Sequence, residues 1–163
     1  FFYFSAGLGA ALIHTGVNYY HVSQGLEALA AAGVPESDVL SLLREGKYNE
    51  TWMQLAPRGD VENMLSSFMT PAVGASGAIY GILVAFGMLF PNSELFLIFL
   101  PVPIKAKYFI PVLIGLDLFS GVTGYSIFGN GIAHFAHIGG ALFGFLMMWY
   151  WKRNQFNKNR WDS

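Results

Sequence analysis

The sequence contains no cysteine and carries little charge. The absence of cysteine among the 163 residues excludes disulfides, thiol catalysis and cysteine-ligated metal sites. Charged residues make up 12% of the chain, whereas soluble domains usually carry about 25%. The formal net charge of −1 gives no overall field that would attract nucleic acid, so we expect no nucleic-acid partner.

Apolar residues make up 54% of the chain and fall in long blocks. A helix that crosses a bilayer needs about 20 mostly apolar residues. Four blocks meet or approach this length, at 1–20, 73–90, 108–128 and 132–151. We therefore expect an all-α, polytopic transmembrane helix bundle embedded in a lipid bilayer.

The segment 21–70 differs in composition from the blocks on either side, because it holds seven of the ten acidic residues. Helical spacing recurs within it, interrupted by Gly33-Val34-Pro35. We expect a solvated loop with short helices of its own.

The basic residues predict how the blocks are oriented in the membrane. Six of them lie in the loop after 73–90 or in the tail after 132–151: Lys105, Lys107, Lys152, Arg153, Lys158 and Arg160. Because basic residues favour the cytoplasmic side, the segment 21–70 and the turn at 129–131 are expected on the external side. The blocks 73–90 and 132–151 then start at the same external depth.

A serine and a histidine occur at that depth. Ser76 lies in Gly74-Ala75-Ser76-Gly77, and His137 lies in a segment that begins at His134. A serine hydroxyl becomes a useful nucleophile when a nearby base, commonly histidine, accepts its proton.

Small residues recur at every fourth position beside both side chains, at Gly77, Gly81 and Ala85 and at Ala136, Gly140 and Gly144. Such stripes let membrane helices pack closely. Each feature alone has an ordinary explanation, as a helix cap, a satisfied intramembrane histidine or a packing contact. Their coincidence at one depth favours a catalytic pair.

Two segments resemble motifs of the rhomboid family of intramembrane serine proteases. Residues 74–81 (GASGAIYG) resemble the Gly-x-Ser-Gly nucleophile segment, and residues 132–140 (IAHFAHIGG) resemble the Ala-His-x-Gly-Gly segment. His137 follows Ser76 by 61 residues, with one further apolar block between them. The resemblance covers essentially the whole chain and implies a rhomboid-like bundle with about four of its six spans present.

The resemblance implies roles for individual residues. Ser76 corresponds to the nucleophile and His137 to the general base, and rhomboids use this dyad without an aspartate. Tyr80 matches the aromatic residue that packs against the catalytic imidazole. Around this pair, Gly74, Ala75 and the Ser76 main-chain N–H correspond to the oxyanion-binding start of the helix, and His134 is expected to support the local hydrogen-bond network.

Part of the family's oxyanion hole has no counterpart here. Rhomboids complete it with a histidine and an asparagine from a helix two spans before the serine. His14 and Asn18 have suitable spacing but lie on the block that best matches the next helix, so we do not assign them. The chain starts without Met inside an apolar block, so we expect upstream spans and little activity from residues 1–163 alone.

Asp117 is an acidic residue inside the apolar block 108–128. An unpaired carboxylate in hydrocarbon is costly, so we expect it near the external interface, bonded to a neighbouring helix, rather than in a catalytic role. His134 and His137 are three residues apart, but no His-Glu-x-x-His pattern or third ligand accompanies them. We expect neither a metal nor another cofactor.

The resemblance implies an intramembrane serine endopeptidase whose partners are transmembrane protein substrates, with block 108–128 as a lateral gate. We expect a multi-pass protein of a bacterial inner membrane; the oligomeric state is left open. One alternative is a catalytically inactive rhomboid-like protein that binds transmembrane helices. A transporter or channel subunit is the least favoured, because only one acidic residue, Asp117, lies within the apolar blocks.

Overall fold

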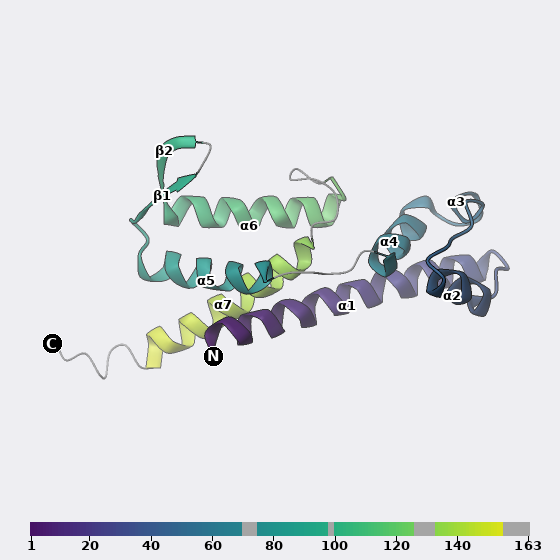
Figure 1. The fold of residues 1–163 in the computed structure, drawn as a ribbon, viewed down its shortest axis with the longest axis horizontal. Helices are drawn as coiled ribbons and strands as arrows, with labels where there is room; N and C mark the ends of the chain where they lie inside the picture. The colour runs from purple at the N-terminus through teal and green to yellow at the C-terminus, as the bar shows by residue number, and fades with distance from the viewer. Residues whose placement is uncertain (70–74, 98–99, 126–132, 155–163) are drawn as a thin grey trace. The chain divides into compact units, whose positions relative to one another are not determined.

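The computed structural model describes residues 1–69, 75–97, 100–125 and 133–154 (Figure 1). In chain order the elements are α1 (Phe2–Ala31), α2 (Glu36–Arg44), α3 (Trp52–Leu55), α4 (Arg58–Met69), α5 (Ser76–Leu89), β1 (Glu94–Leu97), β2 (Leu100–Lys105), α6 (Ala106–Thr123) and α7 (His134–Asn154). The expected helical class is confirmed, and a short hairpin is added to it.

Some sequence predictions fall outside the described residues. These are Gly74, the turn at 129–131, parts of the blocks that include 73, 126–128 and 132, and the tail residues Lys158 and Arg160. The chain divides into two compact units, one made of Phe1–His14 with Gly74–Ser163 and the other of Thr15–Val73.

In the first unit, α5 packs against both α6 and α7, and α6 also packs against α7 (Figure 1). The α5–α7 contact is close because the predicted small-residue stripes face each other. A β-carbon on Gly144 would lie 2.5 Å from the Gly81 Cα, and a β-carbon on Gly77 would lie 3.0 Å from the Ala136 carbonyl oxygen. Only residues without bulky side chains permit this backbone approach.

The first half of α1 also contributes to this unit. A β-carbon on Gly7 would lie 3.5 Å from the Ala78 Cβ of α5, and a β-carbon on Gly139 of α7 would lie 2.8 Å from the Ile13 Cβ. At the beginning of α1, the Phe2 ring lies 5.5 Å from the ring of Trp151 on α7. Helix α1 therefore reaches both helices that carry the predicted catalytic pair.

An antiparallel hairpin joins α5 to α6, with Leu95 paired to Ile104 and Glu94 paired to Lys105. No strand was expected here from the sequence. The main-chain N–H groups of Ala106 and Lys107 donate to the carbonyls of Ser93 and Pro91, at 2.9 and 3.0 Å. These bonds hold the beginning of α6 beside the end of α5.

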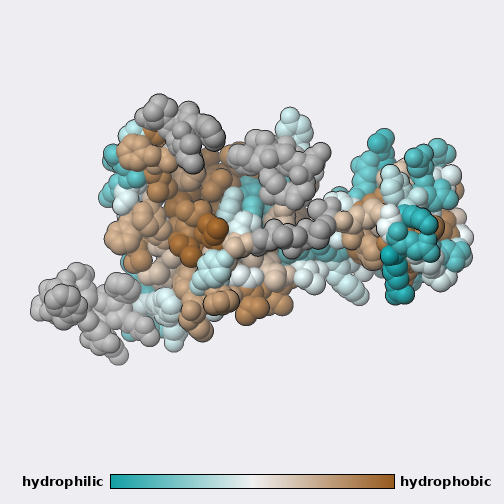
Figure 2. Space-filling view, in the orientation of Figure 1, coloured by the Kyte–Doolittle hydropathy of each residue, from teal (hydrophilic) through white to brown (hydrophobic). Residues whose placement is uncertain are grey.

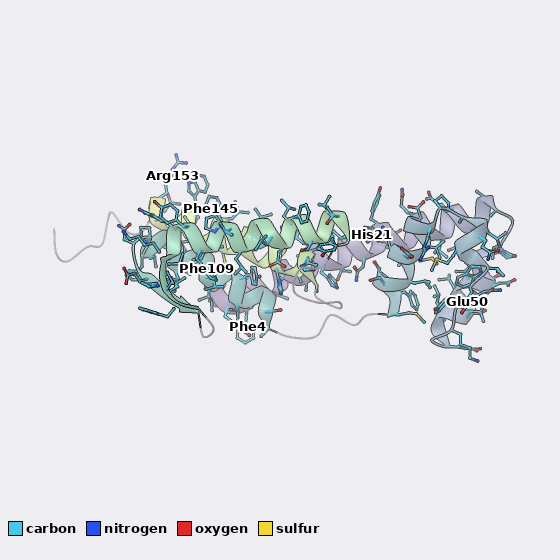
Figure 3. All side chains as sticks on the ribbon, turned by 90° about the horizontal axis from the view of Figure 1, so that it is seen from above. Phe4, His21, Glu50, Phe109, Phe145 and Arg153 are labelled. Carbon is cyan, nitrogen blue, oxygen red and sulfur yellow. The ribbon has the colours of Figure 1, made fainter. Side chains whose placement is uncertain are left out.

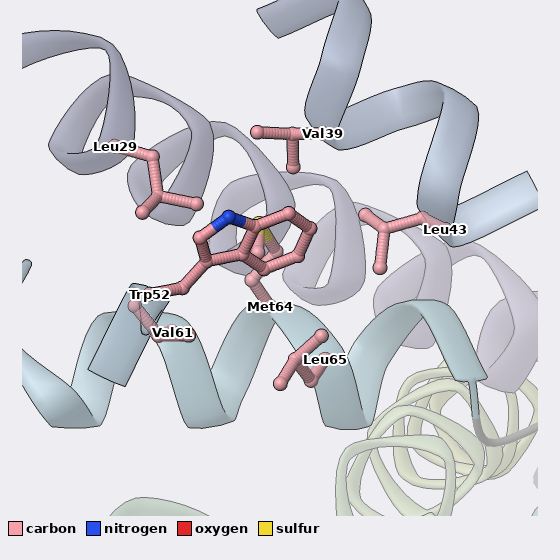
Figure 4. Close-up of a cluster of buried hydrophobic side chains, with 7 residues drawn as sticks. All are labelled: Leu29, Val39, Leu43, Trp52, Val61, Met64 and Leu65. Carbon is pink, nitrogen blue, oxygen red and sulfur yellow. The ribbon is translucent and has the colours of Figure 1, made fainter. Parts of the chain in front are cut away.

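The second unit has its own apolar cluster (Figure 4). Trp52 lies among side chains from α1, α2 and α4, and the buried members are Leu29, Val39, Leu43, Trp52, Val61, Met64 and Leu65. The sequence boundary at residue 20 does not coincide with a helix end, because α1 continues to Ala31. No glycine or proline interrupts it after Gly25 until Gly33, whose φ of 85° ends the helical path.

The surfaces of the two units differ in polarity. Apolar residues dominate the first unit in the view of Figure 2, whereas hydrophilic residues dominate the second. Large exposed hydrophobic side chains of the first unit include Phe4, Leu8, Ile79, Ile82, Val112, Phe119, Val122, Leu142, Phe145 and Trp149. Phe4 and Phe145 are labelled in Figure 3. Such a surface is unusual for a protein in water and suits contact with lipid.

Within the described residues, α6 is the one helix long and apolar enough to cross a membrane by length and composition. Helix α5 is apolar but shorter, with 14 residues. The four membrane spans remain a prediction.

Candidate active site

Ser76 is the first residue of α5 and its side chain is exposed. Ala75 immediately precedes the helix, and its carbonyl accepts a hydrogen bond from the Ile79 N–H at 3.0 Å. The N–H groups of a first helical turn have no acceptor in the preceding turn, and they carry the positive end of the helix dipole. An anion that formed beside Ser76 would therefore meet favourable electrostatics.

His137 lies in the first turn of α7 and is buried. The Tyr80 ring of α5 stacks on its imidazole, with the ring centroids 4.2 Å apart and the planes 11° from parallel. Residues four apart on a helix share a face, with Cβ atoms about 5–6 Å apart. Ser76 therefore lies on the same face of α5 as the ring that covers the imidazole.

Asp117 lies on α6 and connects it to α5 and α7. Its carboxylate is 1% exposed, and Oδ1 lies 2.6 Å from Nδ1 of His134. Its other oxygen, Oδ2, lies 3.2 Å from Nδ1 of His137 and accepts a short hydrogen bond from the Tyr80 hydroxyl. Asp117 thus bonds to neighbouring helices as expected, but on both of its oxygens and with the predicted base as one partner.

Packing around Asp117 keeps the end of α6 beside the start of α7. A β-carbon on Gly121, one turn after Asp117, would lie 3.3 Å from the His134 Cβ. Gly124, with φ of 72°, ends α6 as a left-handed cap, and its N–H donates to the Ser120 carbonyl. Ser120 is also buried, and its hydroxyl has no hydrogen-bond partner among the described residues.

The predicted residues are therefore partly brought together. Tyr80 and His134 adjoin His137 or its partner Asp117, whereas no hydrogen bond joins Ser76 to His137 within the described chain. Hydrogen bonds between catalytic groups are often long in the absence of substrate and shorten when it binds. In the same described ranges, no group of three His, Cys, Asp or Glu residues could hold a metal ion.

Of the two residues left unassigned from the sequence, His14 belongs to the first unit and Asn18 to the second, where the nearby His21 makes a similar contact. Asn18 donates to the Ser67 carbonyl at 3.4 Å, and His21 Nδ1 lies 3.3 Å from the Ser67 hydroxyl. Both contacts tie α1 to α4 within the second unit. The signal that could have marked Asp117 as part of the site was its position, as the single acidic residue in an apolar block.

Comparison with known proteins identifies the family. A model of the rhomboid domain matches residues 47–154, which include all the side chains around Asp117. The chain belongs to the rhomboid family of membrane proteins, as the two motifs predicted.

Proteins that are similar to this chain in sequence include two that are named as mitochondrial. The chain is 26% identical over 149 residues to rhomboid protein 1, mitochondrial, of Saccharomyces cerevisiae, covering 88% of this chain and 40% of that protein. It is 38% identical over 81 residues to the human presenilin-associated rhomboid-like protein, mitochondrial, covering 49% of this chain and 20% of that protein.

The chain thus spans well under half the length of these two relatives, at 40% and 20%. No solved structure matches it significantly. The bacterial inner membrane expected from the sequence has no support here, because the relatives are named as mitochondrial.

Proposed function

We propose that the full-length protein is an intramembrane serine endopeptidase, with Ser76 as nucleophile and His137 as general base. The stacking of Tyr80 on His137 carries this proposal, because it keeps the imidazole against the face of α5 on which Ser76 lies. The four proposed spans, near 1–20, 73–90, 108–128 and 132–151, would hold this pair within the bilayer.

The proposed reaction is hydrolysis of a peptide bond in a transmembrane substrate. The Ser76 hydroxyl attacks the carbonyl carbon as its proton passes to His137. His137 then gives this proton to the departing amine, leaving an acyl ester on Ser76. Water, deprotonated by His137, attacks the ester and releases the acid product.

The start of α5 would stabilise the negative charge on the substrate oxygen during both steps. The N–H of Ser76 belongs to the first helical turn, where donors and the helix dipole are directed outward. By resemblance to the family, further donors would come from a histidine and an asparagine on another helix of the full-length protein.

The test uses the full-length protein in liposomes with a model transmembrane substrate. We expect Ser76→Ala to abolish both cleavage and labelling by a fluorophosphonate probe. Ser37→Ala is the matched control, because Ser37 is an exposed serine of the second unit. Cleavage by Ser76→Ala at the wild-type rate would refute the assignment of the nucleophile.

A second candidate is a catalytically silent rhomboid-like protein that binds transmembrane helices. Within the described residues His137 bonds to Asp117 and not to Ser76, and this observation favours the second candidate. Such a protein would bind the substrate helix but would neither cleave it nor react with the probe.

A further inference from the structure

Asp117 is a buried carboxylate whose three hydrogen-bond partners come from two neighbouring helices. Tyr80 belongs to α5, and His134 and His137 belong to α7. A buried carboxylate is costly unless its oxygens are bonded. These partners fill both oxygens, so the ionised form of Asp117 can be retained in an apolar environment.

The direction of these hydrogen bonds determines which nitrogen of His137 carries a proton. An ionised carboxylate can only accept hydrogen bonds, so Nδ1 of His137 must donate to Asp117. In a neutral imidazole with Nδ1 protonated, Nε2 has no proton and can accept one. This is the nitrogen that a serine hydroxyl requires.

We infer that Asp117 is a positioning residue for His137, so that Ser76, His137 and Asp117 act as a triad. This inference rests on the proposed protease function. It departs from the two-membered dyad that the family resemblance implies, because the structure places a carboxylate beside Nδ1 of the base.

Asp117 is suited to this role because its own orientation does not depend on His137. His134 bonds to Oδ1 at 2.6 Å, and the Tyr80 hydroxyl bonds to Oδ2. Tyr80 also stacks on the imidazole, so that one side chain aligns both the carboxylate and the ring that it orients.

During catalysis Asp117 would keep its negative charge. The serine proton moves to Nε2 of His137, which converts the ring to an imidazolium, and later moves to the leaving amine. Asp117 stabilises the positive charge without accepting the proton. Its contribution should therefore affect the rate of the chemical step more than substrate binding.

The position of α6 is part of this arrangement. Asp117 lies on α6, whereas Ser76 and His137 lie on α5 and α7. If α6 moved away as a gate at this level, it would separate Asp117 from His137. Chemistry would then require α6 to be packed against α5 and α7.

The experiment compares Asp117→Asn and Asp117→Glu with the wild type, in the full-length protein. Asparagine keeps the shape but presents a donor or a weaker acceptor, which no longer favours the required tautomer. We expect kcat to fall by about 100-fold or more with KM changed by less than about threefold. Glutamate keeps the charge and should restore part of kcat.

Ser120→Ala is the matched control. Ser120 is buried on α6 one turn after Asp117, and its hydroxyl has no partner among the described residues. Its removal should leave kcat and the thermal midpoint near the wild-type values. A comparable loss of kcat in Ser120→Ala would indicate that any change on this face of α6 is damaging, and would overturn the inference.

A readout independent of activity is the ¹⁵N NMR signature of the His137 ring in the wild type. We expect a protonated Nδ1 and an unprotonated Nε2, and a change in this signature in Asp117→Asn. The reverse tautomer in the wild type would overturn the inference even if Asp117→Asn does not fold. An unchanged kcat in a folded Asp117→Asn would also overturn it.

These outcomes are distinguishable from failure of the proposed function. If the wild type neither cleaves substrate nor reacts with the fluorophosphonate probe, the protease assignment fails. The NMR signature would still show whether Asp117 orients His137.

Discussion

A β-carbon on Gly140 of α7 would lie 1.8 Å from the main-chain carbonyl oxygen of Gly77 on α5. A side chain of any size at this position therefore requires the two helix backbones to separate. Gly77 is adjacent to Ser76, and Gly140 is one turn from His137, so this contact determines how closely the two side chains can approach.

Gly140→Ala is expected to destabilise the first unit by about 3 kcal/mol, because the obstructing atom belongs to the backbone and cannot rotate away. SDS titration in detergent would measure the change. The control is Gly115→Ala on α6, where nothing lies within 4 Å of an added β-carbon. This variant should be neutral or stabilised by about 0.5–1 kcal/mol, and equal effects of the two substitutions would contradict the close crossing.

Tyr80 makes two separable contacts, the stacking on His137 and the hydroxyl bond to Asp117. Tyr80→Phe keeps the ring and loses the hydroxyl, so kcat should fall by about tenfold, from the loss of a hydrogen bond to a charged group. Tyr80→Leu loses both contacts, so its kcat should be lower still. Cleavage kinetics in liposomes would measure both, and a larger loss in Tyr80→Phe than in Tyr80→Leu would contradict the stacking role.

The α5–α7 contact could be predicted from the sequence because its signal is local. Small residues spaced at four positions mark one face of a helix regardless of its partner. Ser76 and His137 could be chosen as catalytic candidates in the same way, since each lies beside one of these stripes.

The local pattern marks Asp117 as unusual but does not identify its partners. Its three partners are 37, 17 and 20 residues away in sequence, so their convergence depends on the rotation of three helices. The hairpin was missed for a different reason. Pro101 and Pro103 lie within β2, and prolines indicate a break unless the strand lies at a sheet edge, as it does in this two-stranded pair.

Trp52 is 3% exposed at the centre of the cluster in the second unit (Figure 4). Trp52→Ala should destabilise this unit by about 3–5 kcal/mol, because it leaves a large cavity. Hydrogen exchange of the α4 amides would measure the loss of protection. Tyr48→Ala is the control, since Tyr48 is 48% exposed, and equal protection in both variants would contradict the packing.

The absence of cysteine makes the α5–α6 contact accessible to cross-linking within this chain. A β-carbon on Gly87 would lie 3.9 Å from the Ile110 Cβ, within the range of about 3.5–4.5 Å that disulfides require. We expect the pair Gly87→Cys and Ile110→Cys to form a disulfide readily under mild oxidation, detected by a shift in gel mobility.

The control for this cross-link combines Gly87→Cys with Val112→Cys. Val112 is 60% exposed and two residues from Ile110, so it lies on a different face of α6 and should not react. Because the proposed triad needs α6 in its packed position, the cross-linked protein should still be labelled at Ser76. Loss of labelling on oxidation, with recovery on reduction, would instead show that α6 must leave α5 before Ser76 can react.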